Sequence, residues 1–218
     1  MIPVLVLCDD FWHPAEIIER GFKSLKQTDY SFDFCYTPKD VLTPEWVKQF
    51  PVIVCAKGPN RLNSANQNGW FDEGVTEFMI PDFEAYVKEG GGFISLHAGN
   101  TARDKEVGWG PFVGNIFQGH PPRCEIDVKI TGKHPIVDGI SDFVIRDEHY
   151  AIEVIDPNAI ELFRTVSASG GDQPAGYAIE RGKGRLAALT PGHILSVFEN
   201  PSFAQILLNT LKWVRKAA

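Results

Sequence analysis

The sequence predicts an α/β protein with a doubly wound, mostly parallel sheet, and three observations lead to this fold class. In the first half, short β-branched and aliphatic runs alternate with segments of helical spacing. A glycine triplet, Gly90–Gly92, separates a predicted helix from the strand that follows it. The second half carries several short strand patterns, which predict a small antiparallel extension. Because parallel strands need right-handed crossovers, we expect helices on both faces of the sheet.

The first half supplies the parallel strands. The run Val4–Cys8 is apolar throughout, as expected for a strand covered on both faces. Helical spacing of Ile18, Phe22 and Leu25 predicts a helix over Ala15–Lys26. Further strands are expected at Phe32–Tyr36, Val52–Cys55 and Phe93–Leu96, with a helix over Pro81–Lys88.

The second half supplies the extension and the last helix. Ser202 is a suitable N-cap for a final helix whose apolar stripe includes Phe203 and Leu207. No linker or repeat interrupts the chain, so residues 1–218 are expected to form one domain. The expected strands are Arg123–Ile130, Phe143–Ile145, Ile152–Ile155, Leu162–Val166, Tyr177–Ile179 and Gly184–Thr190, the last returning to the central sheet.

Composition excludes two classes of partner. The net charge is −7 and the basic residues are scattered, whereas a nucleic-acid footprint needs a basic stripe. No run approaches the roughly 18–20 apolar residues of a membrane span, and the N-terminus lacks the pattern of a signal peptide. The cysteines share no metal-type spacing, which predicts buried free thiols and favours a cytoplasmic setting. They are Cys8, Cys35, Cys55 and Cys124.

Four of the six histidines close short motifs in which glycine or acidic residues are neighbours. Such loops on a rigid scaffold are where binding and catalytic groups concentrate, and imidazole suits proton transfer or metal ligation near neutral pH. We therefore expect the four loops to converge on one site. The motifs are Leu96-His97-Ala98-Gly99, Gly119-His120-Pro121, Asp147-Glu148-His149-Tyr150 and Pro191-Gly192-His193.

Two of these histidines directly follow predicted parallel strands. His97 and His193 should therefore lie at the carboxyl edge of the sheet, where ligands bind in open α/β folds. A sharp turn at Ala98-Gly99 would hold the His97 side chain exposed above the sheet. The structural alternative is that each imidazole only caps its own turn. His13, at the end of the first strand, is a weaker candidate for the same edge, and His134 is expected in a turn before Ile136.

For the remaining motifs, the sequence leaves open which side chains face the site. Pro121 fixes the direction of His120 at the end of a glycine-bounded loop, residues 114–119. Strand alternation would put Asp147 and His149 on one face and Glu148 on the other, so only one set would face the site. A solvated turn is the alternative there. The loop over residues 57–74, with Trp70 and Phe71, is expected either to cover the pocket or to pack across a homo-oligomer interface.

The ordered motifs resemble the trehalose-utilisation (ThuA-like) family and cover residues 90–213. The resemblance implies a flavodoxin-like fold of the class I glutamine amidotransferase-like type and a link to sugar metabolism. The residues that carry it are Leu96-His97-Ala98, Gly119-His120-Pro121, His134-Pro135-Ile136, Asp147-Glu148-x-Tyr150, Gly182-Lys183-Gly184-Arg185, Gly192-His193, Asn200-Pro201-x-Phe203 and Trp213.

The chain departs from amidotransferase chemistry at two positions that this resemblance identifies. In that superfamily the residue at the elbow is usually a nucleophilic Cys, and a later His-x-Glu pair assists it. Here His97 takes the place of the Cys, and Leu195 takes the place of the Glu partner of His193. A thioester mechanism needs a thiolate, so we expect no glutaminase or peptidase activity of that type.

The site is therefore expected to act on a small-molecule carbohydrate through histidine and carboxylate groups. His97 and His193 with Asp147 or Glu148 are the catalytic candidates. His97, His120 and His193 are an alternative ligand set for a divalent metal such as zinc. An enzyme and a non-catalytic sugar-binding module both remain open. The candidates for substrate binding are His120, His149, Asn100 and Trp12.

Overall fold

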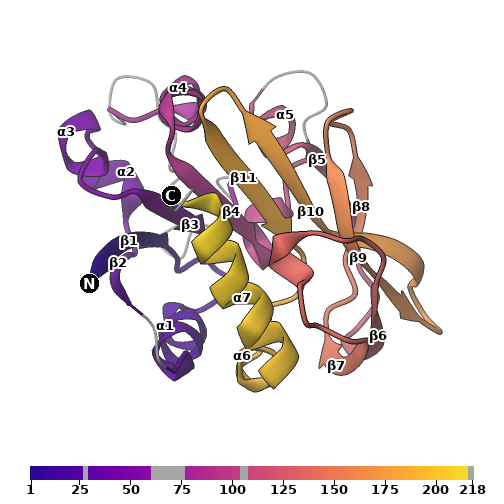
Figure 1. Ribbon diagram of the computed structural model, residues 1–218. Coiled ribbons are helices and arrows are strands. Elements are labelled where there is room, and N and C mark those ends of the chain that lie inside the picture. Colours follow the sequence, from indigo (N-terminus) through magenta and orange to yellow (C-terminus); the bar gives the residue numbers. More distant parts are fainter. Residues whose placement is uncertain (27–28, 60–76, 104–107, 216–218) are drawn as a thin grey trace.

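A mixed sheet runs through the molecule, and its parallel half comes mainly from the N-terminal part of the chain (Figure 1). The computed structural model describes residues 1–26, 29–59, 77–103 and 108–215. Within these residues the sheet has nine strands in the order β2-β1-β3-β4-β11-β10-β9-β6-β7. The parallel strands are β1 (Ile2–Leu7), β2 (Tyr30–Cys35), β3 (Val52–Cys55), β4 (Gly92–Leu96) and β11 (Gly184–Leu189).

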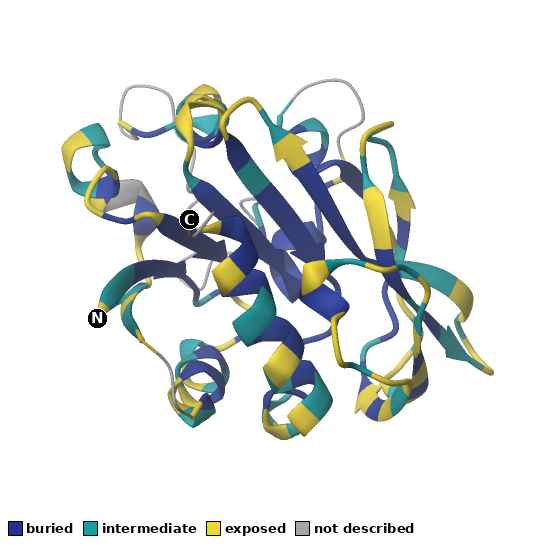
Figure 2. Cartoon of the chain, in the orientation of Figure 1, coloured by how far each residue is buried: buried dark blue, intermediate teal, exposed yellow. Residues whose placement is uncertain are grey.

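Each face of the parallel strands is covered by helices. In β1, Val4 and Val6 pack into one apolar cluster while Leu5 and Leu7 pack into the other, so the strand is buried on both sides (Figure 2). This burial explains the uninterrupted apolar run of β1. One face carries α1 (Ala15–Ser24), α6 (Leu195–Glu199) and α7 (Pro201–Val214), and the other carries α4 (Ile80–Glu89) and α5 (Trp109–Val113); the short helices α2 (Pro38–Val41) and α3 (Pro44–Val47) follow β2.

The antiparallel extension is confirmed, and it contributes four of the nine strands that the described residues form in the main sheet: β10 (Gly171–Arg181), β9 (Ile160–Ser167), β6 (Cys124–Ile130) and β7 (Phe143–Asp147). Two features differ from expectation. The expected loop over residues 114–119 contains a strand, β5 (Asn115–Gly119), and β5 pairs with β8 (Ala151–Val154) in a separate two-stranded sheet. Pairing with a strand distant in sequence outweighed the loop tendency of the glycines at both ends of that segment.

The final helix begins earlier than predicted. Asn200 is its N-cap, and the Asn200 side chain accepts hydrogen bonds from the backbone amides of Ser202 and Phe203. The prediction of Ser202 as the N-cap was therefore wrong. Pro201 occupies the first turn, where the missing N–H costs nothing.

The strand order places four carboxyl ends side by side. The order reverses at β1, which lies between β2 and β3, and a reversal of this kind opens a crevice beyond the strand termini. β1, β3, β4 and β11 are mutually parallel, so the residues after each of them meet at that edge. Most of the expected lid or interface over residues 57–74, including Trp70 and Phe71, lies outside the described residues. No described helix has the length and apolar character to cross a membrane.

Candidate functional site

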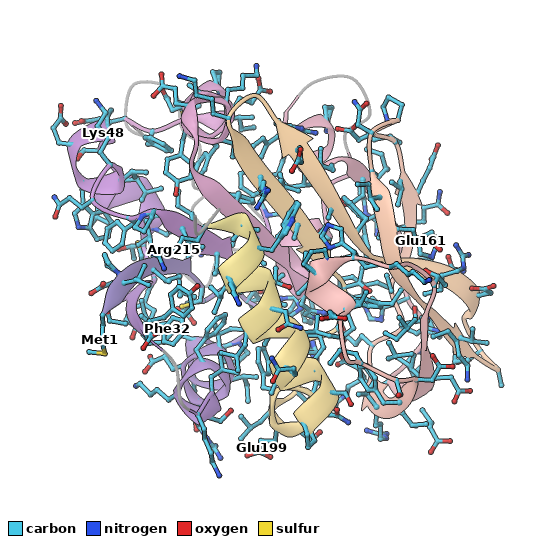
Figure 3. All side chains as sticks on the ribbon, viewed as in Figure 1. Met1, Phe32, Lys48, Glu161, Glu199 and Arg215 are labelled. Atoms are coloured by element: carbon cyan, nitrogen blue, oxygen red, sulfur yellow. The ribbon has the colours of Figure 1, made fainter. Side chains whose placement is uncertain are left out.

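Three imidazoles and one carboxylate converge at the carboxyl edge of the sheet. His13 follows β1, His97 follows β4, His193 follows β11, and Glu148 lies in the connection between β7 and β8. One ligand atom from each lies within 4.8 Å of the others, and we call these four residues the His/Glu cluster. The charged side chains labelled in Figure 3, such as Lys48, Glu161 and Glu199, lie on the outer surface. Members of the cluster are buried or half-buried instead.

His97 occupies a strained turn that aims its ring into the cluster. It begins the short 3-10 helix η2 (His97–Asn100), with a φ of 43° in the left-handed region. Backbone strain of this kind persists where the surrounding structure holds it, often at functional sites. His97 Nδ1 lies 2.8 Å from the carbonyl oxygen of Thr190. Because a carbonyl only accepts, Nδ1 carries a proton, and Nε2 of the neutral ring offers a lone pair to the cluster.

The His97 ring is covered rather than exposed. Its exposed fraction is 1%, so the prediction of a side chain exposed above the sheet was wrong. Burial lowers the pKa of His97, but the bond to Glu148 and the charge of Asp147 outweigh it, and the pKa is raised. The ring is thus ready to hold a positive charge.

His193 is held in place by Asp147. The buried Asp147 carboxylate accepts hydrogen bonds from the backbone amides of Gly192 at 2.7 Å and His193 at 3.2 Å. Burial raises the pKa of Asp147. The Asp147 side chain therefore supports the His193 loop from behind, and Glu148 provides the carboxylate within the cluster.

Glu148 contacts both ring nitrogens at the centre. Its Oε2 lies 3.2 Å from His193 Nδ1 and 3.5 Å from His97 Nε2. Burial raises the pKa of Glu148, but the two imidazoles lower it by a larger amount, so the pKa lies well below the usual range. Strand β7 ends at Asp147, so alternation does not extend to the next residues. Asp147 contacts the His193 loop and Glu148 lies in the cluster, whereas His149 lies apart from it.

His13 proves to be a full member of the cluster. Its Nδ1 lies 2.8 Å from Asp10 Oδ1, and Asp10 Oδ2 also accepts the backbone amide of Gly58 at 2.7 Å. Burial lowers the pKa of His13 despite the bond to Asp10, so the ring is neutral and Nε2 is unprotonated. The signal in the sequence was the Asp10-x-x-His13 spacing directly after the first strand.

Tyr150 and His120 flank the cluster. Tyr150 Oη lies 3.1 Å from His97 Nε2 and 3.4 Å from His13 Nε2, and its ring stacks on His97. The ring of His120 also stacks on Tyr150, and His120 Nε2 lies 3.6 Å from Glu148 Oε2. The side chain of His120 is 34% exposed, so it forms the rim of the site. Sequence reasoning had not selected Tyr150.

Other candidates lie apart from the cluster. His149 bonds to Ser167 and Thr165, and His134 accepts the amide of Ile136 in the expected turn before η3 (Pro135–Val137). The buried Asn100 amide donates to the carbonyl oxygens of Ser95 and Leu189, which pins η2 to the sheet. Trp12 is 61% exposed on the turn next to His13.

The cysteines take no part in this arrangement. All four are free, and Cys8, Cys35 and Cys55 are buried in the two apolar clusters. Burial raises the pKa of the Cys55 thiol to about 12. A thiol of this kind is a poor nucleophile at neutral pH.

The parallel strand order and the crossover helices define a flavodoxin-like α/β fold. Solved structures agree with this class. A ThuA-like protein from Bacteroides uniformis has a TM-score of 0.69 at 18% identity, over 98% of this chain and 91% of that one. A cytoplasmic protein from Salmonella typhimurium LT2 has a TM-score of 0.69 at 14% identity, over 99% and 100%.

A glutamine amidotransferase from Thermotoga maritima shares the fold with a TM-score of 0.62 at 12% identity, over 99% of both chains. No curated protein matches the chain in sequence. The ThuA family model, described as trehalose utilisation, matches residues 4–214. The chain belongs to the ThuA family, and this membership suggests a role in carbohydrate metabolism.

Proposed function

We propose that the protein is an enzyme that acts on a sugar, a polyol or a keto-sugar through the His/Glu cluster. The observation that carries the proposal is the convergence of three imidazoles and a carboxylate within 4.8 Å at the carboxyl edge of the sheet. Titratable groups with shifted pKa values, gathered where α/β folds bind ligands, are typical of catalytic sites.

The arrangement of exposure indicates which groups meet the substrate. His13 and His97 are buried, whereas the side chains of Glu148, His193 and His120 are 14%, 18% and 34% exposed. A hydroxyl or carbonyl group of a sugar would approach from this half-exposed side. Glu148 is ionised and can accept a hydrogen bond from a substrate hydroxyl, and in a site without a metal ion the raised pKa of His97 equips it to stabilise negative charge on a substrate oxygen.

Family membership supports the substrate class. The family description names trehalose utilisation, and the site offers hydrogen-bonding groups of the kind that hydroxyl-rich ligands require. The exposed Trp12 indole beside His13 gives a face on which a sugar ring can stack. The Salmonella neighbour is named a cytoplasmic protein, which supports a cytoplasmic setting for this chain too.

A screen of trehalose, maltitol and 3-keto-glycosides tests the proposal. Each compound is added to the purified protein, and melting temperature and product formation are followed together. A ligand present at about 100 times its dissociation constant stabilises the fold by roughly 2.7 kcal/mol, which is readily detected. We expect at least one compound to raise the melting temperature and to be converted.

Glu148→Gln is the matched variant, because it keeps the shape of the side chain and removes its charge. We expect turnover to fall by at least about 100-fold, while His134→Ala, outside the cluster, leaves turnover unchanged. Binding of a sugar without conversion by the wild-type protein would instead support the non-catalytic sugar-binding module.

A further inference from the structure

We propose that the His/Glu cluster binds one divalent cation, preferably zinc, through His13, His97, His193 and Glu148, with His120 outside the ligand set. The inference concerns the site of the proposed function and deepens it, and its link to catalysis rests on that function. It differs from the trio expected from the sequence, because His13 and Glu148 replace His120.

The distances between the ligand atoms fit tetrahedral coordination of a zinc ion. Four ligands at about 2.0–2.1 Å from a central zinc lie about 3.3 Å from one another. The three measured edges are 3.3 Å for His97 Nε2 to His193 Nδ1, 3.5 Å for His97 Nε2 to Glu148 Oε2, and 3.2 Å for His193 Nδ1 to Glu148 Oε2. These atoms therefore form one triangular face of such a site. His13 lies within 4.8 Å of them, so ligation requires its ring nitrogen to move inward by up to about 1.5 Å.

The cluster holds more lone pairs than protons. His97 donates from Nδ1 to Thr190, and His13 donates from Nδ1 to Asp10, so both Nε2 atoms face inward as acceptors. Glu148 Oε2 adds a third acceptor close to His97 and His193, and the Tyr150 hydroxyl has only one proton to share between the two Nε2 atoms. A single cation can bind all four ligand atoms of the cluster, whereas one proton can bridge only two of them.

The surroundings are those of a ligand shell. Metal-bound histidines usually donate their other ring N–H to a carboxylate or a backbone carbonyl, which fixes ring orientation. Asp10 does this for His13 and the Thr190 carbonyl does it for His97. Asp147 fixes the His193 loop through two backbone amides. The rings of His13 and His97, and the backbone of the His193 loop, are thus fixed without a bound ion.

The donor set selects the metal. Three imidazole nitrogens and one carboxylate suit zinc and related transition metals, whereas calcium and magnesium prefer oxygen ligands. His120 stays outside, because among the described residues it does not belong to the group of ligand atoms within 4.8 Å of one another, and its Nε2 lies 3.6 Å from Glu148 on the rim. His120 is then left beside the ion on the half-exposed side, and the buried Tyr150 hydroxyl lies next to the ligand nitrogens.

Zinc titration by isothermal calorimetry tests the site. The full chain is first stripped with a chelator, and no carbohydrate is present. We expect saturable binding of one zinc ion per chain, and at least a tenfold weaker affinity for Glu148→Gln and for His193→Asn. His120→Ala, on the rim, should still bind one zinc ion per chain, and the control His134→Ala, outside the site, should bind within about threefold of the wild type. Circular dichroism of each variant verifies that it is folded.

The outcomes separate the two proposals. Absence of saturable zinc binding, or equal affinity in wild type, Glu148→Gln and His193→Asn, overturns the metal site and leaves the carbohydrate screen to be judged separately. Loss of binding in His134→Ala would equally overturn it, as it would indicate an adventitious surface site. If zinc binds as expected while no carbohydrate is bound or converted, the metal site stands and the proposed function fails.

Discussion

His97 is the residue on which the site depends, and its position combines strain with close packing. The ring points into the cluster because the backbone at His97 turns into the left-handed region directly after β4. That turn brings Gly99 against the end of β3. Small residues after His97 were correctly predicted to allow a sharp turn, although the resulting burial of the ring was not.

Gly99→Ala should damage this turn. An added Cβ would lie 2.4 Å from the carbonyl oxygen of Cys55, a backbone atom that cannot move aside freely. We expect a loss of about 1–3 kcal/mol in the free energy of unfolding, measured by urea denaturation. Unchanged stability would show that the turn does not pack as tightly as described.

Residue identity predicted part of the site. Glycine beside a histidine after a strand was a usable signal for His97 and His193. His13 was undervalued because its turn is stabilised by the Asp10 side chain rather than by glycine. Tyr150 was missed because an aromatic residue near a strand is indistinguishable in sequence from a core residue, and Glu148 was ambiguous because alternation stops where β7 ends.

At the scale of elements, the cap of α7 decides where the last helix begins. Asn200→Ala removes the acceptor of two backbone amides and should cost about 1 kcal/mol in the free energy of unfolding. Ser202→Ala is the matched control, with an expected change below about 0.5 kcal/mol. Urea denaturation of both variants checks this prediction, and a larger effect at Ser202 would return the cap to that residue.

The ion pair between Asp156, which follows β8, and Arg181, at the end of β10, should make the free energy of unfolding depend on pH. Burial raises the pKa of Asp156, but its 2.6 Å bond to Arg181 and further hydrogen bonds lower it below the ordinary value. A carboxyl group of this kind stabilises the fold above its unfolded pKa, and that contribution disappears as pH falls through the folded pKa.

Asp156→Asn should therefore lower the free energy of unfolding by about 1–2 kcal/mol at pH 7. The difference from wild type should shrink below about pH 4. Urea denaturation at pH 7 and pH 3 measures both values. An equal difference at the two pH values would mean that the charge of Asp156 is not responsible.

Strand existence was easier to predict than strand pairing. The apolar run of β1 and the alternation of β6 are local signals, since they depend on which faces are buried. The pairing of β5 with β8 depends on contacts across more than thirty residues of chain, and sequence periodicity carries no information about that contact.

For the whole molecule, the fold class followed from alternating elements, but the sheet order did not. The sequence predicted that the last apolar strand returns to the central sheet. It did not predict that β11 lies between β4 and β10, where it joins the parallel and antiparallel parts. This insertion brings His193 beside His97 and makes a common site of loops that are 96 residues apart.

Anomalous diffraction at the zinc edge, from crystals of the zinc-loaded protein, tests the central claim most directly. We predict one strong peak per chain, about 2.0–2.2 Å from the side-chain donor atoms of His13, His97, His193 and Glu148. A peak bound elsewhere on the chain, or imidazole rings that point away from one another around an unfilled edge of the sheet, would contradict the account.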